Sequence, residues 1–212
     1  MRFIRIFSAL GLMAFACLPT PLHAISAAEV KKLYEEATLT FDNVFIGDSI
    51  TFLGLWPELL NHSTIGNRGI GGDTTNGLYE RMGNILATNP KRVFIMIGLN
   101  DAYQDRTPVD YMFLNYKKIV DLLINNNINV VITSTVICNQ VLSEKCRNAL
   151  PKINELNKRL HSLTQDYRIP YLDLNSLLSG KNGLDEKFTS DGVHLNLNAY
   201  KIWAGLVAPY IL

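Results

Sequence analysis

The sequence is poor in the residues from which metal and redox sites are built. Among its 212 residues there are three cysteines and four histidines, and no Cys-x-x-Cys or His-x-x-x-His pair occurs. Structural zinc sites and dithiol redox sites use such spacings. The glycine-rich stretch around 69–72 is followed by neither Lys-Ser nor Lys-Thr, as a phosphate-binding loop would require. We therefore expect a protein that works without a metal and without an organic cofactor.

The sequence also lacks an excess of charge of one sign. Lys and Arg total 20, Asp and Glu total 19, and the formal net charge is +1. Proteins that bind nucleic acid neutralise many phosphates and carry a clear basic excess, so we expect no nucleic-acid partner. With 48% hydrophobic and 18% charged residues, the composition is typical of a globular protein and excludes a disordered or low-complexity chain.

The N-terminal hydrophobic run is too short to cross a membrane. It covers residues 6–18, follows Arg2 and Arg5, and leads into small residues at its end. A membrane-spanning helix needs about 20 apolar residues, whereas this pattern is typical of a secretory signal peptide. We predict a signal peptide over 1–24 and an exported protein, periplasmic or secreted, with no stable membrane span after cleavage. An uncleaved N-terminal anchor and a lipid on Cys17 are the alternatives.

Removal of the signal leaves two cysteines, Cys138 and Cys146. It also removes Arg2 and Arg5 and no acidic residue, so the net charge becomes −1. Thiols exported to an oxidising compartment are expected to pair. Closing so short a loop contributes only about 2.5 kcal/mol to stability. A structural disulfide is our prediction, with two free buried thiols as the alternative.

The remaining chain alternates between short apolar runs and longer helical patterns. Continuous apolar strands without alternation indicate a parallel sheet covered on both faces. The pattern predicts an α/β protein with a three-layer α/β/α sandwich and a mainly parallel sheet, formed by one domain over 25–212. Thr107 is the expected cap of the third helix and Pro108 its first residue. The predicted strands are 44–46, 63–65, 93–97, 130–133 and 169–172, and the predicted helices are 28–36, 73–86, 109–124, 150–163 and 196–207.

A serine and a histidine follow two of the predicted elements at the places where such sheets bind ligands. Ser49 follows the first strand in Gly-Asp-Ser, and His194 stands three residues after Asp191, just before the last helix. Serine is a poor nucleophile without a base, and an Asp-x-x-His pair lets a carboxylate orient the imidazole. Of the other histidines after the predicted signal, His62 is expected to be solvated and His161 to have a surface or packed role on its helix.

Two further groups are candidates for binding the oxyanion that forms when serine attacks an ester. Asn100 follows the longest apolar strand, and Gly72 lies just before a helix, where its backbone N–H is exposed. Each has a simpler interpretation: Asn100 with Asp101 as a turn that caps a helix, and 69–72 as a flexible turn.

These motifs together resemble the four sequence blocks of the SGNH hydrolases, the GDSL-type esterases and lipases. The matching segments are Gly47-Asp48-Ser49-Ile50, Gly72-Asp73, Gly98-Leu99-Asn100-Asp101 and Asp191-Gly192-Val193-His194, in this order along nearly the whole chain after the signal. Residues 67–75 further resemble the branch that includes lysophospholipase L1 and the catalytic subunits of platelet-activating-factor acetylhydrolase. The one departure, Ile50 in place of leucine, is conservative.

The resemblance implies a flavodoxin-like fold and a role for each matching residue. Ser49 would be the nucleophile, His194 the general base and Asp191 the residue that orients the imidazole. The backbone N–H groups of Ser49 and Gly72 and the side chain of Asn100 would form the oxyanion hole. The implied reaction is ester hydrolysis through an acyl-enzyme. An O-acetyltransferase using the same site and a non-catalytic carbohydrate-binding module are the alternatives.

The substrate is less well indicated than the reaction. Short loops and the lack of an evident lid favour an open site and a short acyl group, such as an acetyl ester of a glycan or small molecule, or a lysophospholipid lying in a groove. The apolar stretch 52–56 could line an acyl pocket, although Trp56 is expected to pack a helix onto the sheet. Tyr103 and the loop between Cys138 and Cys146 are predicted to border the site. The sequence does not indicate an oligomeric state.

Overall fold

The centre of the molecule is a five-stranded parallel sheet. The computed structural model describes residues 25–37 and 39–212, and in that part of the chain the strands lie in the order β2-β1-β3-β4-β5. This is the strand order of flavodoxin-like doubly wound sheets, so the predicted fold class is confirmed. The strands are β1 (Asn43–Gly47), β2 (Ile65–Gly69), β3 (Arg92–Met96), β4 (Asn129–Thr133) and β5 (Tyr171–Leu172), and each neighbouring pair is parallel.

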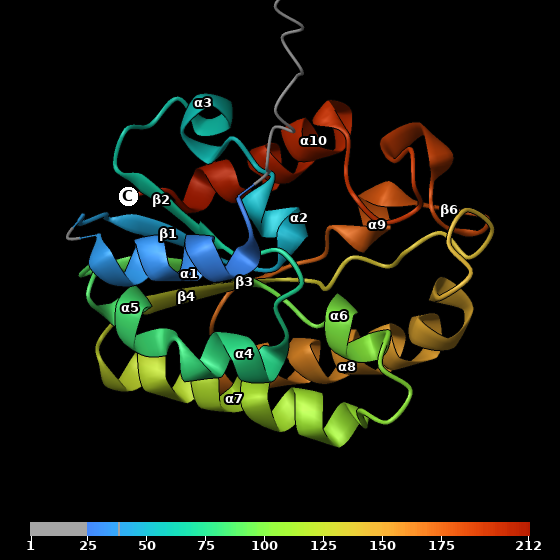
Figure 1. The fold of residues 1–212 in the computed structure, drawn as a ribbon, viewed down its shortest axis with the longest axis horizontal. Coiled ribbons are helices and arrows are strands. Elements are labelled where there is room, and N and C mark those ends of the chain that lie inside the picture. Colours follow the sequence, from blue (N-terminus) through green and yellow to red (C-terminus); the bar gives the residue numbers. More distant parts are fainter. Residues whose placement is uncertain (1–24, 38) are drawn as a thin grey trace, which may run out of the picture.

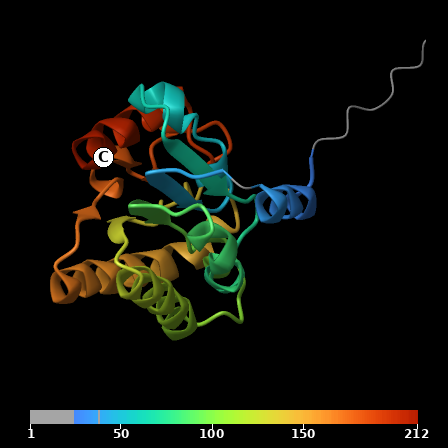
Figure 2. The same cartoon turned by 90° about the vertical axis from the view of Figure 1, so that its left-hand side faces the viewer.

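Helices cover both faces of this sheet (Figures 1 and 2). One side carries α2 (Ser49–Phe52), α3 (Trp56–Leu60) and α10 (Leu197–Val207), and the other carries α4 (Thr75–Glu80), α7 (Val109–Asn125) and α8 (Cys146–Tyr167). The helix α1 (Ala27–Glu36) projects from the body in Figure 2. The remaining elements are α5 (Met82–Leu86), α6 (Leu99–Ala102), α9 (Asn175–Leu178), the hairpin of β6 (Ser179–Gly180) and β7 (Gly183–Leu184), and 3-10 turns at Glu186–Phe188 and Ala208–Tyr210.

The sheet has the continuous apolar strands that a doubly covered sheet requires. Every residue of β1 is buried, and the Phe45 ring stacks between those of Trp56 and Phe94, with centroids 4.1 and 4.6 Å away. Trp203 of α10 meets Trp56 edge to face at 4.6 Å. These contacts hold α3 and α10 on the sheet. They confirm that Trp56 packs in the core rather than lining a pocket.

Several element boundaries differ from those predicted. The helix expected over 73–86 is two helices, α4 and α5, separated at Arg81, whose side chain turns inward to hydrogen-bond buried carbonyls. Pro108 rather than Thr107 is the N-terminal cap of α7, because the Thr107 hydroxyl donates to Gln104 instead. The strand expected over 169–172 is limited to its last two residues, where pairing with β4 occurs.

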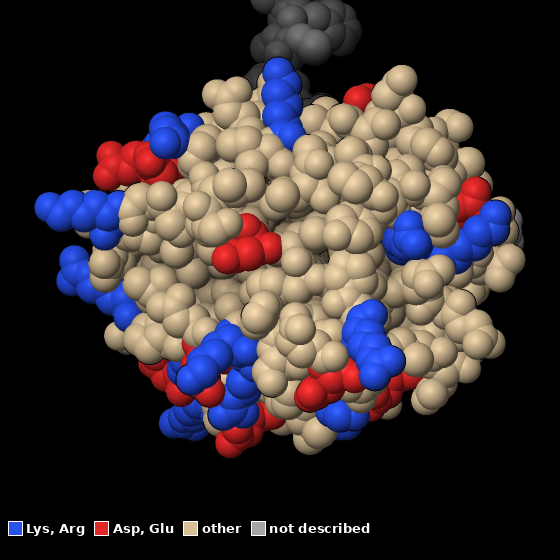
Figure 3. Space-filling model, turned by 180° about the vertical axis from the view of Figure 1, so that it is seen from behind, with Lys and Arg blue, Asp and Glu red and all other residues tan. Residues whose placement is uncertain are grey.

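The predicted signal peptide over 1–24 and the lipidation alternative at Cys17 lie outside the described residues. Within the described part of the chain, no helix is both long and apolar enough to span a membrane. Figure 3 shows the face opposite to that of Figure 1, on which acidic and basic side chains are mixed and lie mostly towards the rim of a broad uncharged area.

Candidate active site

The serine of the Gly-Asp-Ser motif lies where strand β1 ends and α2 begins. Ser49 is the first residue of this short helix, and Asp48 caps it by accepting the backbone N–H of Ile50 at 2.9 Å. Tyr200 of α10 donates its hydroxyl to the Ile50 carbonyl at 2.6 Å. The turn that presents Ser49 is therefore held by the Asp48 cap and by the hydrogen bond from Tyr200 of α10.

The histidine predicted from the Asp-x-x-His motif reaches this serine. The Ser49 Oγ and the His194 Nε2 are 3.0 Å apart, although 145 residues separate them in the sequence. The other ring nitrogen, Nδ1, lies 2.6 Å from Oδ2 of Asp191. With Nδ1 protonated towards the carboxylate, Nε2 presents a lone pair to the serine hydroxyl. This is the tautomer in which an imidazole can accept a proton from serine.

Both carboxylate oxygens of Asp191 accept hydrogen bonds. Its Oδ1 accepts the backbone N–H groups of Val193 and His194 at 2.9 and 2.8 Å, and the Thr189 hydroxyl at 3.2 Å. Partial burial works to raise the pKa of this carboxyl, but the hydrogen bonds from the His194 ring and from these backbone groups outweigh it and lower the pKa of Asp191 to about 2. The carboxylate is thus charged throughout the range in which histidine titrates.

Three N–H groups converge beside the serine. The backbone N–H groups of Ser49 and Gly72 make no hydrogen bond within the described residues. Gly72 has a φ of +78°, a left-handed conformation that favours glycine. The Asn100 amide donates one hydrogen to the Asp73 carbonyl at 2.9 Å, which orients the side chain, and Ser49, Gly72 and Asn100 all line one cavity. This set of donors is able to stabilise an oxyanion.

A buried ion pair holds the Gly72 segment against the sheet. Arg81 donates from Nε to Asp73 at 2.7 Å, and its other nitrogens donate to the carbonyls of Arg68 at 2.8 Å and Gly47 at 3.2 Å. The Arg81 residue is 4% exposed. Burial raises the pKa of Asp73, while the adjacent guanidinium acts to lower it. Arg81 therefore links the ends of β1 and β2, the strands that precede Ser49 and Gly72.

Two other carboxyls near the serine are buried without a cation. Asp48 is 1% exposed, and its second oxygen, Oδ2, has no hydrogen-bond partner among the described residues. Burial raises the pKa of Asp48 to about 7 despite the hydrogen bond from Ile50, and the nearby charge of Asp73 adds to the increase. Asp101 accepts both the N–H and the hydroxyl of Thr75, and burial raises its pKa as well.

Ser49 and His194 open into a cavity of about 470 Å³. Ser49 and His194 form one end of it, and Tyr103, Ser143 and Lys145 contribute to its walls. The last two belong to the loop closed by a disulfide bond between Cys138 and Cys146. The structure thus places both Tyr103 and the disulfide loop beside the serine, where the sequence predicted them. The side chains of 52–55 do not line this cavity.

The other candidate residues lie apart from this site. His62 hydrogen-bonds Thr64 in a turn, and His161 is exposed on α8 with its ring against Tyr171. Sequence reasoning missed Arg81, which stands in an unremarkable helical pattern and gave no signal. It also missed Lys145, for which the only signal was its place beside Cys146. Across residues 25–37 and 39–212, no group of three or more His, Cys, Asp or Glu side chains is arranged to hold a metal ion.

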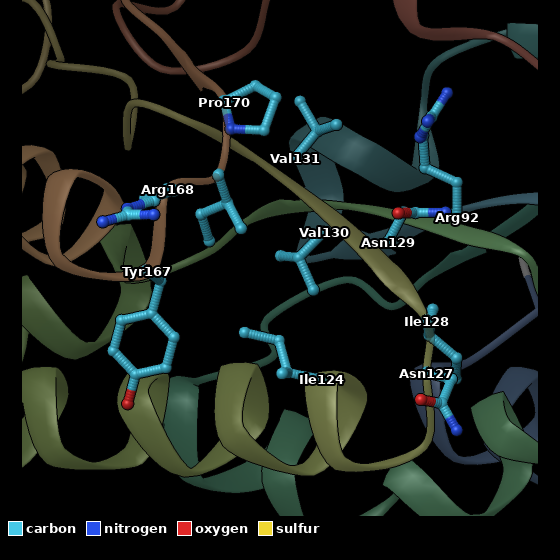
Figure 4. A pocket seen from close by; sticks show the side chains of 11 residues that line it. Arg92, Ile124, Asn127, Ile128, Asn129, Val130, Val131, Tyr167, Arg168 and Pro170 are labelled. Atoms are coloured by element: carbon cyan, nitrogen blue, oxygen red, sulfur yellow. The ribbon is translucent and has the colours of Figure 1, made fainter.

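A second cavity of about 360 Å³ opens at the opposite edge of the sheet, at the amino ends of β3 and β4 (Figure 4). Val130, Ile124 and Tyr167 line it together with Arg92, whose guanidinium is directed away from Tyr167 and donates to the Tyr210 carbonyl. No nucleophile or titratable pair comparable to Ser49 and His194 is among its lining residues. Ligands of open parallel sheets bind at the carboxyl ends of the strands, which favours the first cavity.

Comparison with known proteins agrees with this geometry. The sequence model of the GDSL-like lipase/acylhydrolase family matches residues 45–202. A GDSL-like lipase from Bacteroides thetaiotaomicron is 26% identical with a TM-score of 0.76, covering 87% of this chain and 98% of that one. A provisionally named acylhydrolase from Bacteroides fragilis is 28% identical with a TM-score of 0.75, covering 86% and 94%.

An N-acylneuraminate cytidylyltransferase from Streptococcus agalactiae serotype V is 30% identical over 182 residues. The match covers 84% of this chain but only 41% of that protein, so the chain corresponds to less than half of the relative. The family match, in contrast, includes both the Ser49 and the His194 segments. The chain therefore belongs to the GDSL-like lipase/acylhydrolase family and is a carboxylic ester hydrolase.

Proposed function

We propose that this protein is an exported serine esterase that removes a short acyl group through a Ser49–His194–Asp191 triad. The observation that carries the proposal is the continuous hydrogen-bonded chain from Ser49 Oγ through the imidazole to Asp191, next to three N–H groups with free or oriented hydrogens. A structural or purely binding role does not require a nucleophile, an oriented base and oxyanion donors at one point.

The proposed reaction has two acyl-transfer steps. Ser49 Oγ attacks the ester carbonyl while its proton moves to His194 Nε2, and the carbonyl oxygen becomes an oxyanion facing Gly72 and Asn100. The C–O bond to the alcohol then breaks, and His194 gives the proton to the leaving alcohol. Water attacks the acyl-enzyme with its proton passing to His194, the acid is released, and Ser49 regains its proton.

We further propose that the acyl group is carried by an acidic sugar. The Streptococcus agalactiae relative is named for N-acylneuraminate, and this chain corresponds to 41% of it. Cytidylyl transfer is not ester hydrolysis, so the shared part supports a common sugar rather than a common reaction. The cavity of about 470 Å³ suits a short acyl ester of a monosaccharide better than a long acyl chain.

The test is hydrolysis of 4-nitrophenyl acetate and 4-nitrophenyl octanoate by the chain without residues 1–24. Ser49→Ala is the decisive variant and Ser176→Ala, an exposed serine in α9, is the matched control. We expect turnover with a preference for acetate, lost in Ser49→Ala and unchanged in Ser176→Ala. Turnover that survives Ser49→Ala would refute the triad. Acyl transfer to a sugar acceptor in preference to water would instead identify an O-acetyltransferase, and ester binding without turnover a binding module.

A further inference from the structure

One wall of the catalytic cavity carries polar groups that the proposed triad chemistry does not use. It is formed by Tyr103, Ser143 and Lys145, which we call the polar wall. The Tyr103 hydroxyl is shielded from solvent and has no hydrogen-bond partner among the described residues, although the Ser143 side chain lies near it. A buried hydroxyl without a partner costs stability, and the Ser143 side chain is the neighbour that can pair with it, which leaves Ser143 and Lys145 as the groups of the wall that face a ligand.

The polar wall is held rigidly relative to the histidine. The disulfide closes the loop that carries Ser143 and Lys145. Within this loop the Asn139 side-chain oxygen accepts the backbone N–H groups of Val141 and Leu142, and its amide nitrogen donates to the Leu184 carbonyl of β7. The Asn139 backbone N–H also donates to the Gly192 carbonyl at 2.8 Å, two residues before His194.

The loop packs closely against Gly192. Gly192 has a φ of +80°, and a Cβ there would lie 2.8 Å from the Leu142 side chain. The distance between the polar wall and the imidazole is therefore set by the disulfide within the loop and by the backbone hydrogen bond from Asn139 to Gly192. Such preorganisation is what a specificity site needs.

The electrostatics of the wall favour an anion. Lys145 is exposed and forms no ion pair within the part of the chain that the structure describes. Helix α8 begins at the next residue, with no acidic side chain in its first turn, so the positive end of its dipole adds to the ammonium charge. Glu144, between Ser143 and Lys145 in the sequence, does not line the cavity, Asp191 faces the imidazole, and Asp48 is buried.

Burial raises the pKa of Tyr103, so its hydroxyl stays protonated and able to donate at neutral pH. The Lys145 ammonium and the Ser143 hydroxyl on one wall match the acceptors of a carboxylate. An alkyl chain lying on the same wall would cover the Lys145 charge, which is unfavourable. The wall thus distinguishes between the two substrate classes considered from the sequence, a lysolipid and a polar ester.

We propose that the polar wall, Tyr103, Ser143 and Lys145, is the specificity site that binds a carboxylate on the alcohol part of the ester. This inference rests on the proposed esterase function and adds to it the residues that recognise the acid group of the substrate, an acyl ester of a hydroxy acid. Lys145 pairs with the carboxylate, Ser143 donates a hydrogen bond to it, and Tyr103 supports Ser143.

The test compares two substrates that differ only in charge. O-acetylated N-acetylneuraminic acid and the same compound with its carboxylate converted to a carboxamide are assayed for acetate release. We expect kcat/KM to favour the acid by about tenfold or more, because hydrogen bonds to charged groups are worth more than those to neutral ones. Lys145→Met should bring the ratio of the two close to one, mainly through KM, and Lys145→Arg should keep part of the preference.

The matched control is Lys158→Met, an exposed lysine of the same helix outside the cavity, which should leave the ratio unchanged. Equal kcat/KM for acid and carboxamide in the unsubstituted protein, or turnover of neither when 4-nitrophenyl acetate is hydrolysed, would overturn this proposal alone. Loss of 4-nitrophenyl acetate hydrolysis itself would overturn the proposed function. An equal fall for both sugars in Lys145→Met would show that the lysine acts structurally.

Discussion

The buried carboxyl of Asp48 should make the protein less stable as the pH rises through the range 4 to 7. Its pKa is raised from an ordinary value of 3.8 to about 7, first by burial and then by the charges of Asp73 and Asp101, while the Ile50 N–H and the His194 ring oppose the increase. Between these two values the folded protein keeps a proton that the unfolded chain has lost. The free energy of unfolding therefore falls with pH in this window and levels off above it.

The magnitude follows from the size of the increase. A rise from 3.8 to about 7 corresponds to about 4 kcal/mol of unfolding free energy lost between the acidic and the alkaline side of the window. Asp48→Asn removes this titration while its amide oxygen still accepts the Ile50 N–H. The variant also places an amide donor where Oδ2 has no partner, which costs about 1–3 kcal/mol but does not depend on pH.

The assay is urea denaturation of both proteins at half-unit steps from pH 4 to pH 8. From pH 4 to pH 8, we expect the free energy of unfolding of the variant to rise by about 4 kcal/mol relative to that of the unsubstituted protein. Contributions that do not depend on pH cancel when the two pH values are compared. Asp166→Asn, at an exposed carboxyl of α8, is the matched control. A stability difference between the Asp48→Asn variant and the unsubstituted protein that stays the same at every pH would refute the reasoning, whatever its absolute size.

Two further substitutions test the oxyanion hole and its support. Asn100→Ala should lower kcat roughly 10²–10³-fold with little change in KM, as expected for loss of one oxyanion donor, and a rate equal to that of the unsubstituted enzyme would contradict the assignment. Arg81→Met should destabilise the fold by about 3–5 kcal/mol in urea denaturation, because it leaves Asp73 buried without its cation. The double variant with Asp73→Asn should recover part of that loss, and no recovery would mean that the carbonyl contacts of Arg81 dominate.

The sequence predicted those features that depend on local order along the chain. Unbroken apolar runs identified β1, β3 and β4, and Ser49 and Asn100 follow two of these strands at the edge where parallel strands end. The prediction for β2 was wrong in its bounds, since Ile65–Gly69 shares only Ile65 with the expected strand 63–65. The Asp191–His194 hydrogen bond is likewise local, since three residues separate its partners. The convergence of this pair on Ser49 was predicted only by resemblance to a known family.

The remaining features depend on contacts that no local pattern records. Arg81 interrupts a helical pattern that looks continuous in the sequence. Its side chain turns inward because the ends of β1 and β2 lie side by side, and no local pattern in the sequence shows that these ends meet. Lys145 reads as a surface lysine, and only the folding of the disulfide loop onto Gly192 brings it to the cavity. The strand 169–172 is shorter than predicted for the same reason, since its extent depends on where β4 lies.

Three aspartates explain why the reacting groups occur in short sequence blocks. Asp48 precedes Ser49 and accepts the Ile50 N–H, and Asp73 and Asp101 follow Gly72 and Asn100. Asp73 binds the next backbone N–H and Arg81, and Asp101 binds the N–H and hydroxyl at the start of α4. Ser49, Gly72 and Asn100 are thus each next in sequence to a carboxyl that fixes the local turn. A substitution at any of the three should therefore act on activity through the position of its neighbour rather than through contact with the ester.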